Sequence, residues 1–175
     1  AVGKKAYEKK AKIIGISDGG ELKEFLENIK APGYFFDPVY NPSGQPRIGF
    51  GYLIGGIMGL LSNLKVLNLH KDSIITAINN VKIPEIEKEA EQIAKKIFNK
   101  YPYYIVSEFL TGVGNAIANQ TNETAKSISS FRVIPELNHH LMEGLKNPNE
   151  LKRISIFIFF FSKLFSSSIQ KRFII

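Results

Sequence analysis

The chain has 175 residues, of which 44% are hydrophobic and 22% are charged, values typical of a globular domain and not of a disordered chain. It contains no cysteine, which excludes a disulfide framework and thiolate chemistry and fits a reducing compartment such as the cytoplasm. The net charge of +7 is compatible with an anionic partner, but acidic residues are interspersed among the N-terminal lysines. We therefore interpret the positive charge as a solvated surface.

No apolar run approaches the roughly 20 residues of a membrane-spanning helix, and no signal-peptide pattern follows the N-terminal lysines. We expect no membrane segment.

The first half of the chain is expected to form a strand–helix–strand unit followed by a long helix. The pattern predicts a helix over residues 1–10, a strand at 12–17, a tight turn at 18–20, a helix at 21–30 and a strand at 33–36. The handed crossover makes these two strands parallel. A loop rich in proline and glycine then leads to Arg47, where a helix begins and runs to about Leu64. Because this helix is apolar nearly all round, we expect it to be buried between layers or packed closely against a neighbour.

The second half repeats the alternation after a polar connection at residues 66–82, which holds a short helical piece around 73–80. The expected elements are an amphipathic helix at 84–100, a strand at 103–107, a helix at 108–130 with a break near 112–114, a strand at 131–134, a loop at 135–144 leading into a short helix, and a strand at 154–161. Two rounds of strand and helix predict an α/β fold with parallel sheets covered on both faces.

Candidate catalytic groups gather in the second half. His139 and His140 follow a predicted strand, so we expect them at the carboxyl end of a parallel sheet, where open α/β folds bind ligands. Glu123 lies sixteen residues before His139, within a cluster of amides. Taken alone, a histidine after a strand is more often a hydrogen-bonded loop residue, and Glu123 would be a surface carboxylate paired with Lys126.

The segments around these residues resemble a known family. NQTNETAK (119–126) followed by PELNHH (135–140) resembles the NQxNENAK … PELNHN signature of the bifunctional phosphoglucose/phosphomannose isomerases, which belong to the sugar-isomerase (SIS) domain superfamily. The spacing from Glu123 to His139 also matches. QPRIGFGYLIGG (45–56) resembles the arginine-led helix that ends the family's first SIS domain. The resemblance implies a three-layer αβα SIS domain, Rossmann-like and of flavodoxin type, over residues 66–175, and a remnant of a preceding SIS domain over residues 1–65.

The family interconverts glucose 6-phosphate or mannose 6-phosphate with fructose 6-phosphate through a cis-enediolate, and it uses neither metal nor cofactor. By position, the resemblance implies that Glu123 is the proton-transfer base, His139 opens the sugar ring and Arg47 stabilises the enediolate. It places three further residues near the substrate: Gln120, Asn122 and Asn138. These residue types suit the roles, because imidazole titrates near neutrality and guanidinium keeps its charge.

The resemblance also carries expectations about the whole protein. The family's phosphate-binding Ser-Gly-Asn-Thr loop would precede Ala1 and its closing C-terminal helix would follow Ile175. The chain is therefore expected to be a fragment with little activity of its own. Family members supply the histidine across a subunit interface, which implies a homodimer of the full-length protein. Preference between glucose and mannose is not predicted.

Two other functions remain open at this point. A non-catalytic SIS domain would sense a sugar phosphate without turning it over. A nucleic-acid binder would use the positive charge, but no helix-turn-helix, zinc or aromatic-basic motif supports it, and we expect no nucleic-acid partner.

Overall fold

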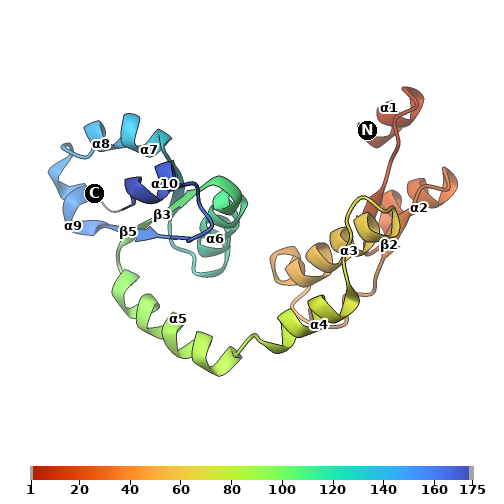
Figure 1. Cartoon of the computed structure of the whole chain (residues 1–175), viewed down its shortest axis with the longest axis horizontal. Coiled ribbons are helices and arrows are strands. Elements are labelled where there is room, and N and C mark those ends of the chain that lie inside the picture. The colour runs from red at the N-terminus through yellow and green to blue at the C-terminus, as the bar shows by residue number, and fades with distance from the viewer. Residues whose placement is uncertain (1, 174–175) are drawn as a thin grey trace. The chain divides into compact units, whose positions relative to one another are not determined.

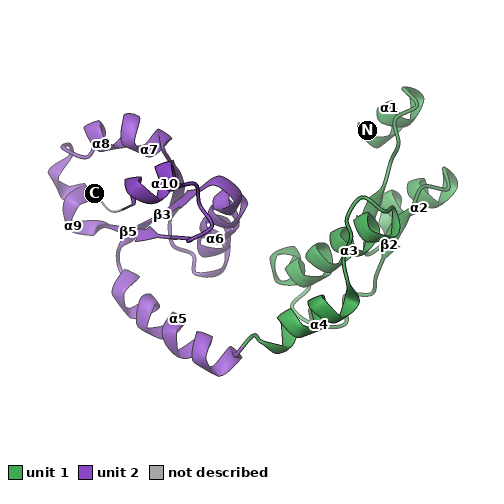
Figure 2. Ribbon diagram, viewed as in Figure 1, with its two compact units in different colours: residues 1–81 green, residues 82–175 purple. Residues whose placement is uncertain are grey.

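The computed structural model describes residues 2–173, and it divides the chain between Val81 and Lys82 into two compact units (Figure 2). Ala1, in the first expected helix, and the last two residues of the expected second domain lie outside the described residues. Parallel strands flanked by helices make up each unit (Figure 1). The helix α4 (Lys71–Asn79), expected in the connection between domains, belongs to the first unit.

The first unit contains the expected strand–helix–strand arrangement. Its elements are α1 (Val2–Glu8), β1 (Gly15–Ser17), α2 (Gly20–Asn28), β2 (Gly33–Phe35), the 3-10 turn η1 (Pro46–Gly49), α3 (Phe50–Asn63) and α4. β1 and β2 are parallel and pair in register from Gly15 opposite Gly33 to Ser17 opposite Phe35. The predicted parallel crossover is confirmed.

Glycine allows helices to approach both faces of this small sheet. A Cβ on Gly15 would collide with the side chain of Leu26 in α2. On the other face, a Cβ on Gly56 of α3 would collide with Tyr34 of β2. The sheet of the first unit therefore lies between α2 and α3.

The expectation that the long apolar helix would be buried is wrong for most of its surface. Within the described chain, Gly56 and Leu60 are the buried residues of α3, whereas Leu53, Ile54 and Ile57 are 40–50% exposed. Two three-residue strands give α3 too small a sheet to cover more than one of its faces.

The second unit contains a three-stranded sheet. Its elements are α5 (Ile83–Ile97), β3 (Tyr101–Ser107), the 3-10 turn η2 (Glu108–Leu110), α6 (Thr111–Thr124), β4 (Ser130–Ile134), α7 (Glu136–His139), α8 (Leu141–Gly144), α9 (Asn149–Ile154), β5 (Ser155–Phe159) and α10 (Ser167–Arg172). The strand order is β4-β3-β5, and both pairings are parallel. All three predicted strands of this half are confirmed.

The central strand β3 is buried on both faces, which explains its continuous apolar sequence. Tyr103 and Ile105 point to one face and pack in a cluster with Phe165 and Ile169 around α10. Successive strand residues face opposite sides, so Val106 packs instead against α6. The second unit is thus a three-layer αβα domain, as the sequence predicts.

Two helical details differ from the expectation. α6 runs without a break through residues 112–114 and ends at Thr124. A Cβ on Gly114 would lie 2.7 Å from Val106 Cγ2, so this glycine permits close packing on β3 and does not interrupt the helix. The expected loop at 135–144 contains the short helices α7 and α8.

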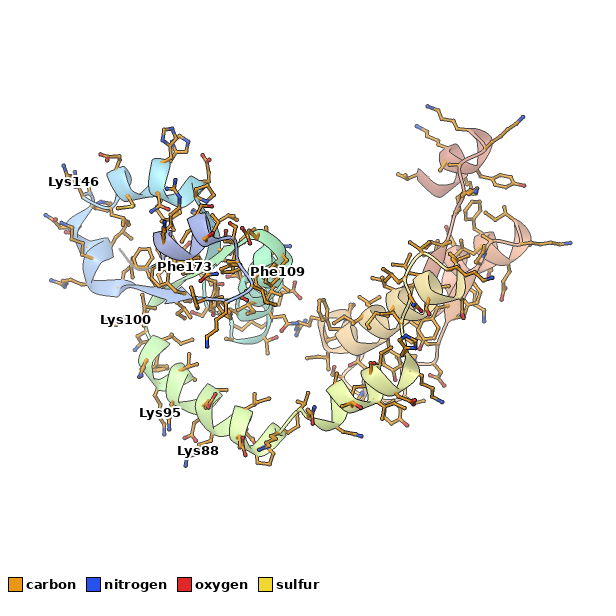
Figure 3. The ribbon with its side chains drawn as sticks, viewed as in Figure 1. Lys88, Lys95, Lys100, Phe109, Lys146 and Phe173 are labelled. Atoms are coloured by element: carbon orange, nitrogen blue, oxygen red, sulfur yellow. The ribbon has the colours of Figure 1, made fainter. Side chains whose placement is uncertain are left out.

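The amphipathic helix α5 is exposed along nearly all of its length, and Figure 3 shows Lys88 and Lys95 projecting from it. Its apolar residues Ile86 and Ile93 are 52% and 48% exposed. Among the described helices, none combines the length and apolar character needed to cross a membrane.

Candidate functional site

Glu123 lies in the last turn of α6, and its side chain is exposed. The neighbouring Asn122 fixes where this turn sits relative to the sheet. Its Oδ1 accepts a hydrogen bond from the backbone N–H of Ser129 at 2.8 Å, and its Nδ2 donates to the Ser129 carbonyl at 3.3 Å. Ser129 immediately precedes β4, so Glu123 is held near the amino end of that strand.

The side chain of Ser129 also connects the segment before β4 to α6, and this residue is only 7% exposed. Its hydroxyl donates to the carbonyl of Ala118 in α6 at 2.8 Å. These bonds satisfy backbone groups in the connection between α6 and β4, where unpaired buried groups would be costly. Asn122 is therefore a structural residue of this connection, a role that the sequence did not suggest.

His139 is the last residue of α7, which begins directly after β4 and Pro135. This places the imidazole at the carboxyl end of the sheet, as expected. Its ring lies beside that of His140, with 4.3 Å between the ring centroids. Leu137 of the same helix packs against the core cluster, so the apolar face of α7 fixes the helix that carries His139.

Around His139, the polar side chains form local pairs. His140 Nε2 lies 2.8 Å from Glu136 Oε1, one helical turn away. Asn138 Nδ2 donates to the sulfur of Met142 at 3.5 Å, and its buried Oδ1 accepts no hydrogen bond within residues 2–173. A buried oxygen without a donor costs about 1–3 kcal/mol.

A groove of about 600 Å³ runs between the edge strand β4 and the helices α7 and α8. Its polar lining residues are Arg132, Glu136 and His140. Arg132 also lies over the ring of Tyr103, 5.8 Å from the centroid. Burial raises the pKa of the Tyr103 hydroxyl, Tyr101 raises it further, and Arg132 opposes both effects.

Glu123 and His139 lie at opposite ends of β4 within one copy of the chain. β4 has five residues, and at about 3.3 Å per residue its ends are roughly 13 Å apart. The fold thus gives each group a defined position but does not bring the two together in a single copy. Gln120, one turn before Glu123 in α6, is exposed.

Arg47 belongs to the first unit, whereas Glu123 and His139 belong to the second. It lies in η1, half-buried, at the start of the α3 region. Its Nη1 donates to Gln45 Oε1 at 2.9 Å. The described residues contain no group of three or more His, Cys, Asp or Glu side chains that could hold a metal ion.

Comparison with known proteins adds to this geometry. A family described as "Bacterial phospho-glucose isomerase C-terminal SIS domain" matches residues 86–175, about half of the chain. A bifunctional phosphoglucose/phosphomannose isomerase from Caldicellulosiruptor bescii is 31% identical over 157 residues, covering 83% of this chain and 45% of the relative. The protein of the same name from Aquifex aeolicus is 26% identical over 155 residues, covering 87% and 45%.

A third relative, D-glucosamine-6-phosphate 4-epimerase from Sulfolobus acidocaldarius, is 29% identical over 131 residues and covers 75% of this chain and 41% of the relative. The chain therefore spans less than half the length of these three relatives. No solved structure matches significantly.

A parallel sheet with helices on both faces defines the second unit as a three-layer α/β domain. More narrowly, the chain belongs to the family of bacterial phosphoglucose isomerase C-terminal SIS domains. The first unit, residues 1–81, lies wholly outside the region that the family model matches.

Proposed function

We propose that the natural protein containing this chain is an aldose–ketose isomerase that interconverts glucose 6-phosphate and mannose 6-phosphate with fructose 6-phosphate. The observation that carries this proposal is the pairing of Glu123 and His139, in family order and spacing, within a domain of the phosphoglucose isomerase family. The names of the Caldicellulosiruptor and Aquifex relatives support the substrate class. The lack of cysteine fits a cytoplasmic setting for this reaction.

In this proposal the reaction passes through a cis-enediolate. His139 transfers the proton that opens the sugar ring. Glu123 then removes the proton from C2 of the open aldose, and the resulting carboxylic acid protonates C1. The hydroxyl proton moves from O2 to O1, which gives the ketose. Arg47 holds the enediolate oxygen with a guanidinium that stays protonated throughout. General acid–base groups of this kind contribute about 10²–10⁴ each to the rate. No metal or cofactor takes part.

Two copies would assemble each site. Glu123 and His139 of one copy lie near opposite ends of β4, whose ends are roughly 13 Å apart, so a second copy is the proposed source of the histidine. We therefore propose a homodimer in which His139 of one subunit meets Glu123 of the other. The exposure of both side chains supports this arrangement, because each is accessible to a partner.

The 175-residue chain alone is proposed to have little activity. It contains no Ser-Gly-Asn-Thr sequence, and phosphate binding energy is needed to position the reacting carbons. We propose that residues 1–65 are the end of a first SIS domain and that residues 66–175 belong to a second. Gln120, Asn122 and Asn138 remain proposed neighbours of the substrate.

The test is an isomerase assay of the natural gene product and of the 175-residue chain. With fructose 6-phosphate, the gene product should form glucose 6-phosphate, and its Glu123→Gln variant should lose at least about a hundredfold in kcat. Glucosamine 6-phosphate should be included because of the epimerase relative. Turnover by the 175-residue chain near that of the Caldicellulosiruptor isomerase would contradict the proposed dependence on further residues.

A non-catalytic sugar-phosphate sensor is the second candidate, and the same variant separates it from the enzyme. A sensor would bind fructose 6-phosphate and respond to it equally in the wild type and in the Glu123→Gln variant, without forming product. Calorimetric binding in parallel with the assay distinguishes the two functions.

A further inference from the structure

We infer that Gln45 is a positioning residue for Arg47. The loop of residues 37–46, which contains Gln45 and precedes Arg47, holds Gln45 in place. The inference rests on the proposed function, since it concerns the group that would stabilise the enediolate. Arg47 Nη1 donates to Gln45 Oε1 at 2.9 Å. A guanidinium has five N–H donors in a rigid plane, so a hydrogen bond to one of them helps to fix the orientation of the whole plane.

The backbone of Gln45 is fixed from both sides. Its N–H donates to the hydroxyl of Ser43 at 3.3 Å. Its carbonyl accepts from Asn41 Nδ2 at 2.8 Å and from the N–H of Ile48 at 2.9 Å. Because Pro46 follows, Gln45 is also restricted to extended dihedral angles, and it has φ −89° and ψ 122°.

Asn41 is the centre of the loop. It is only 8% exposed, and its Oδ1 accepts from the hydroxyl of Ser43 at 2.7 Å. Its backbone N–H donates to the Pro38 carbonyl at 2.8 Å, and its carbonyl accepts from Gly44 at 3.0 Å. A buried amide with both ends of its side chain bonded is a rigid element, because losing either bond would leave a buried polar group unpaired.

The loop is also attached to the rest of the first unit. The N–H of Tyr40 donates to the hydroxyl of Tyr52 in α3 at 2.8 Å, and the Tyr52 ring stacks on Phe36 with centroids 4.5 Å apart. Asn41 and Pro46 border a cavity of about 390 Å³ that Ser17 and Phe36, at the carboxyl ends of β1 and β2, also line. Ligands of open α/β sheets bind at such ends. The loop is thus fixed against α3, its hydrogen bonds fix the backbone of Gln45, and the Gln45 side chain in turn orients Arg47.

The first measurement uses nuclear magnetic resonance on the 175-residue chain and needs no activity. Rotation of the Arg47 guanidinium about the Nε–Cζ bond should be slowed by the bond to Gln45. Gln45→Met, which keeps the length of the side chain and removes the acceptor, should speed this rotation about fivefold, the factor expected for one hydrogen bond. Arg132, whose Nη1 donates to the Phe131 carbonyl, is the internal control and should not change.

The second measurement uses the natural gene product. Gln45→Met should lower kcat about tenfold with little change in KM, because misplacement of a positioned group affects the transition state. Gln45→Glu keeps an acceptor and should recover most of the lost kcat. In an Arg47→Lys background, Gln45→Met should have no further effect, since contacting residues are not additive. Gln92→Met, on the exposed helix α5, is the matched control and should behave as wild type.

Unchanged rotation of Arg47 in Gln45→Met would overturn the inference whatever the activity. Faster rotation with an unchanged kcat would also overturn it, because the bond would then serve no catalytic purpose. If Arg47→Lys is as active as wild type, the proposed role of Arg47 fails, and the catalytic part of this inference fails with it. The rotation measurement still decides separately whether Gln45 holds the guanidinium.

Discussion

The two units share a strand–helix–strand architecture but differ in how many of their apolar side chains are buried. In the second unit β3 has a strand on each side and helices on both faces, so Ile105 and Val106 are 0% exposed. In the first unit two three-residue strands face a long apolar helix, and Leu26 and Leu60 are the buried apolar residues within its described part. A buried core therefore depends on a central strand flanked on both edges and not on apolar content alone.

The largest effect is expected in the core of the second unit. Ile105→Ala should lower the free energy of unfolding of this unit by about 2–5 kcal/mol, since it opens a cavity at a fully buried position. The matched change in the first unit, Ile54→Ala on α3, should cost only about 0.5 kcal/mol because that side chain is 48% exposed.

Urea unfolding, monitored by hydrogen exchange of the amides in β3 and α3, measures the loss of unfolding free energy in each unit. Equal losses for Ile105→Ala and Ile54→Ala would contradict the comparison, because α3 would then be buried in solution.

A smaller effect should separate two glycines within α6. Gly114→Ala should cost about 1–3 kcal/mol, because the added Cβ would lie 2.7 and 2.9 Å from the two methyl groups of Val106. Gly112 has no atom within 4 Å of its added Cβ, so Gly112→Ala should be neutral or stabilise by about 0.5 kcal/mol through helix propensity. Thermal unfolding of both variants is the measurement. Similar values for the two would mean that α6 does not pack on β3 as described.

The smallest effect concerns the contact between η2 and the start of α10. Glu108 has a left-handed φ of 44°, and its carboxylate accepts hydrogen bonds from the Ser166 N–H at 3.2 Å and the Ser166 hydroxyl at 2.5 Å. Figure 3 shows Phe109, beside Glu108, and Phe173, after α10, in the same part of the second unit. Glu108→Ala should cost about 1 kcal/mol and speed amide exchange in α10.

Glu108→Gly separates the two contributions at this residue, because glycine removes the hydrogen bonds but adopts the positive φ without strain. It should speed exchange in α10 as Glu108→Ala does and cost less in stability. Unchanged exchange in both variants would show that Glu108 does not hold α10.

The strands and their parallel pairing could be predicted because each strand is a short apolar run between turn signals. Ile105 and its neighbours are an example, since a run without alternation indicates a strand buried on both faces. The candidate site rests on the family motif, whose order and spacing propose Glu123 and His139, and it stays a prediction.

The remaining features depend on contacts between distant residues. The break expected near Gly114 is absent. The glycine serves instead to make room for Val106 of β3, which lies where a Cβ would be. The exposure of α3 depends on how many strands face it, which its own sequence does not encode. The separation of Glu123 from His139 follows from the length and direction of β4, and it became visible only in the fold.

The most direct test of the proposed function follows hydrogen at the reacting carbons. The natural gene product, incubated with fructose 6-phosphate in deuterium oxide, should place solvent deuterium at C2 of the glucose 6-phosphate formed. The Glu123→Gln variant should lose this incorporation together with turnover while still binding the sugar phosphate. Deuterium incorporation and turnover that persist at the wild-type rate in Glu123→Gln would contradict the account.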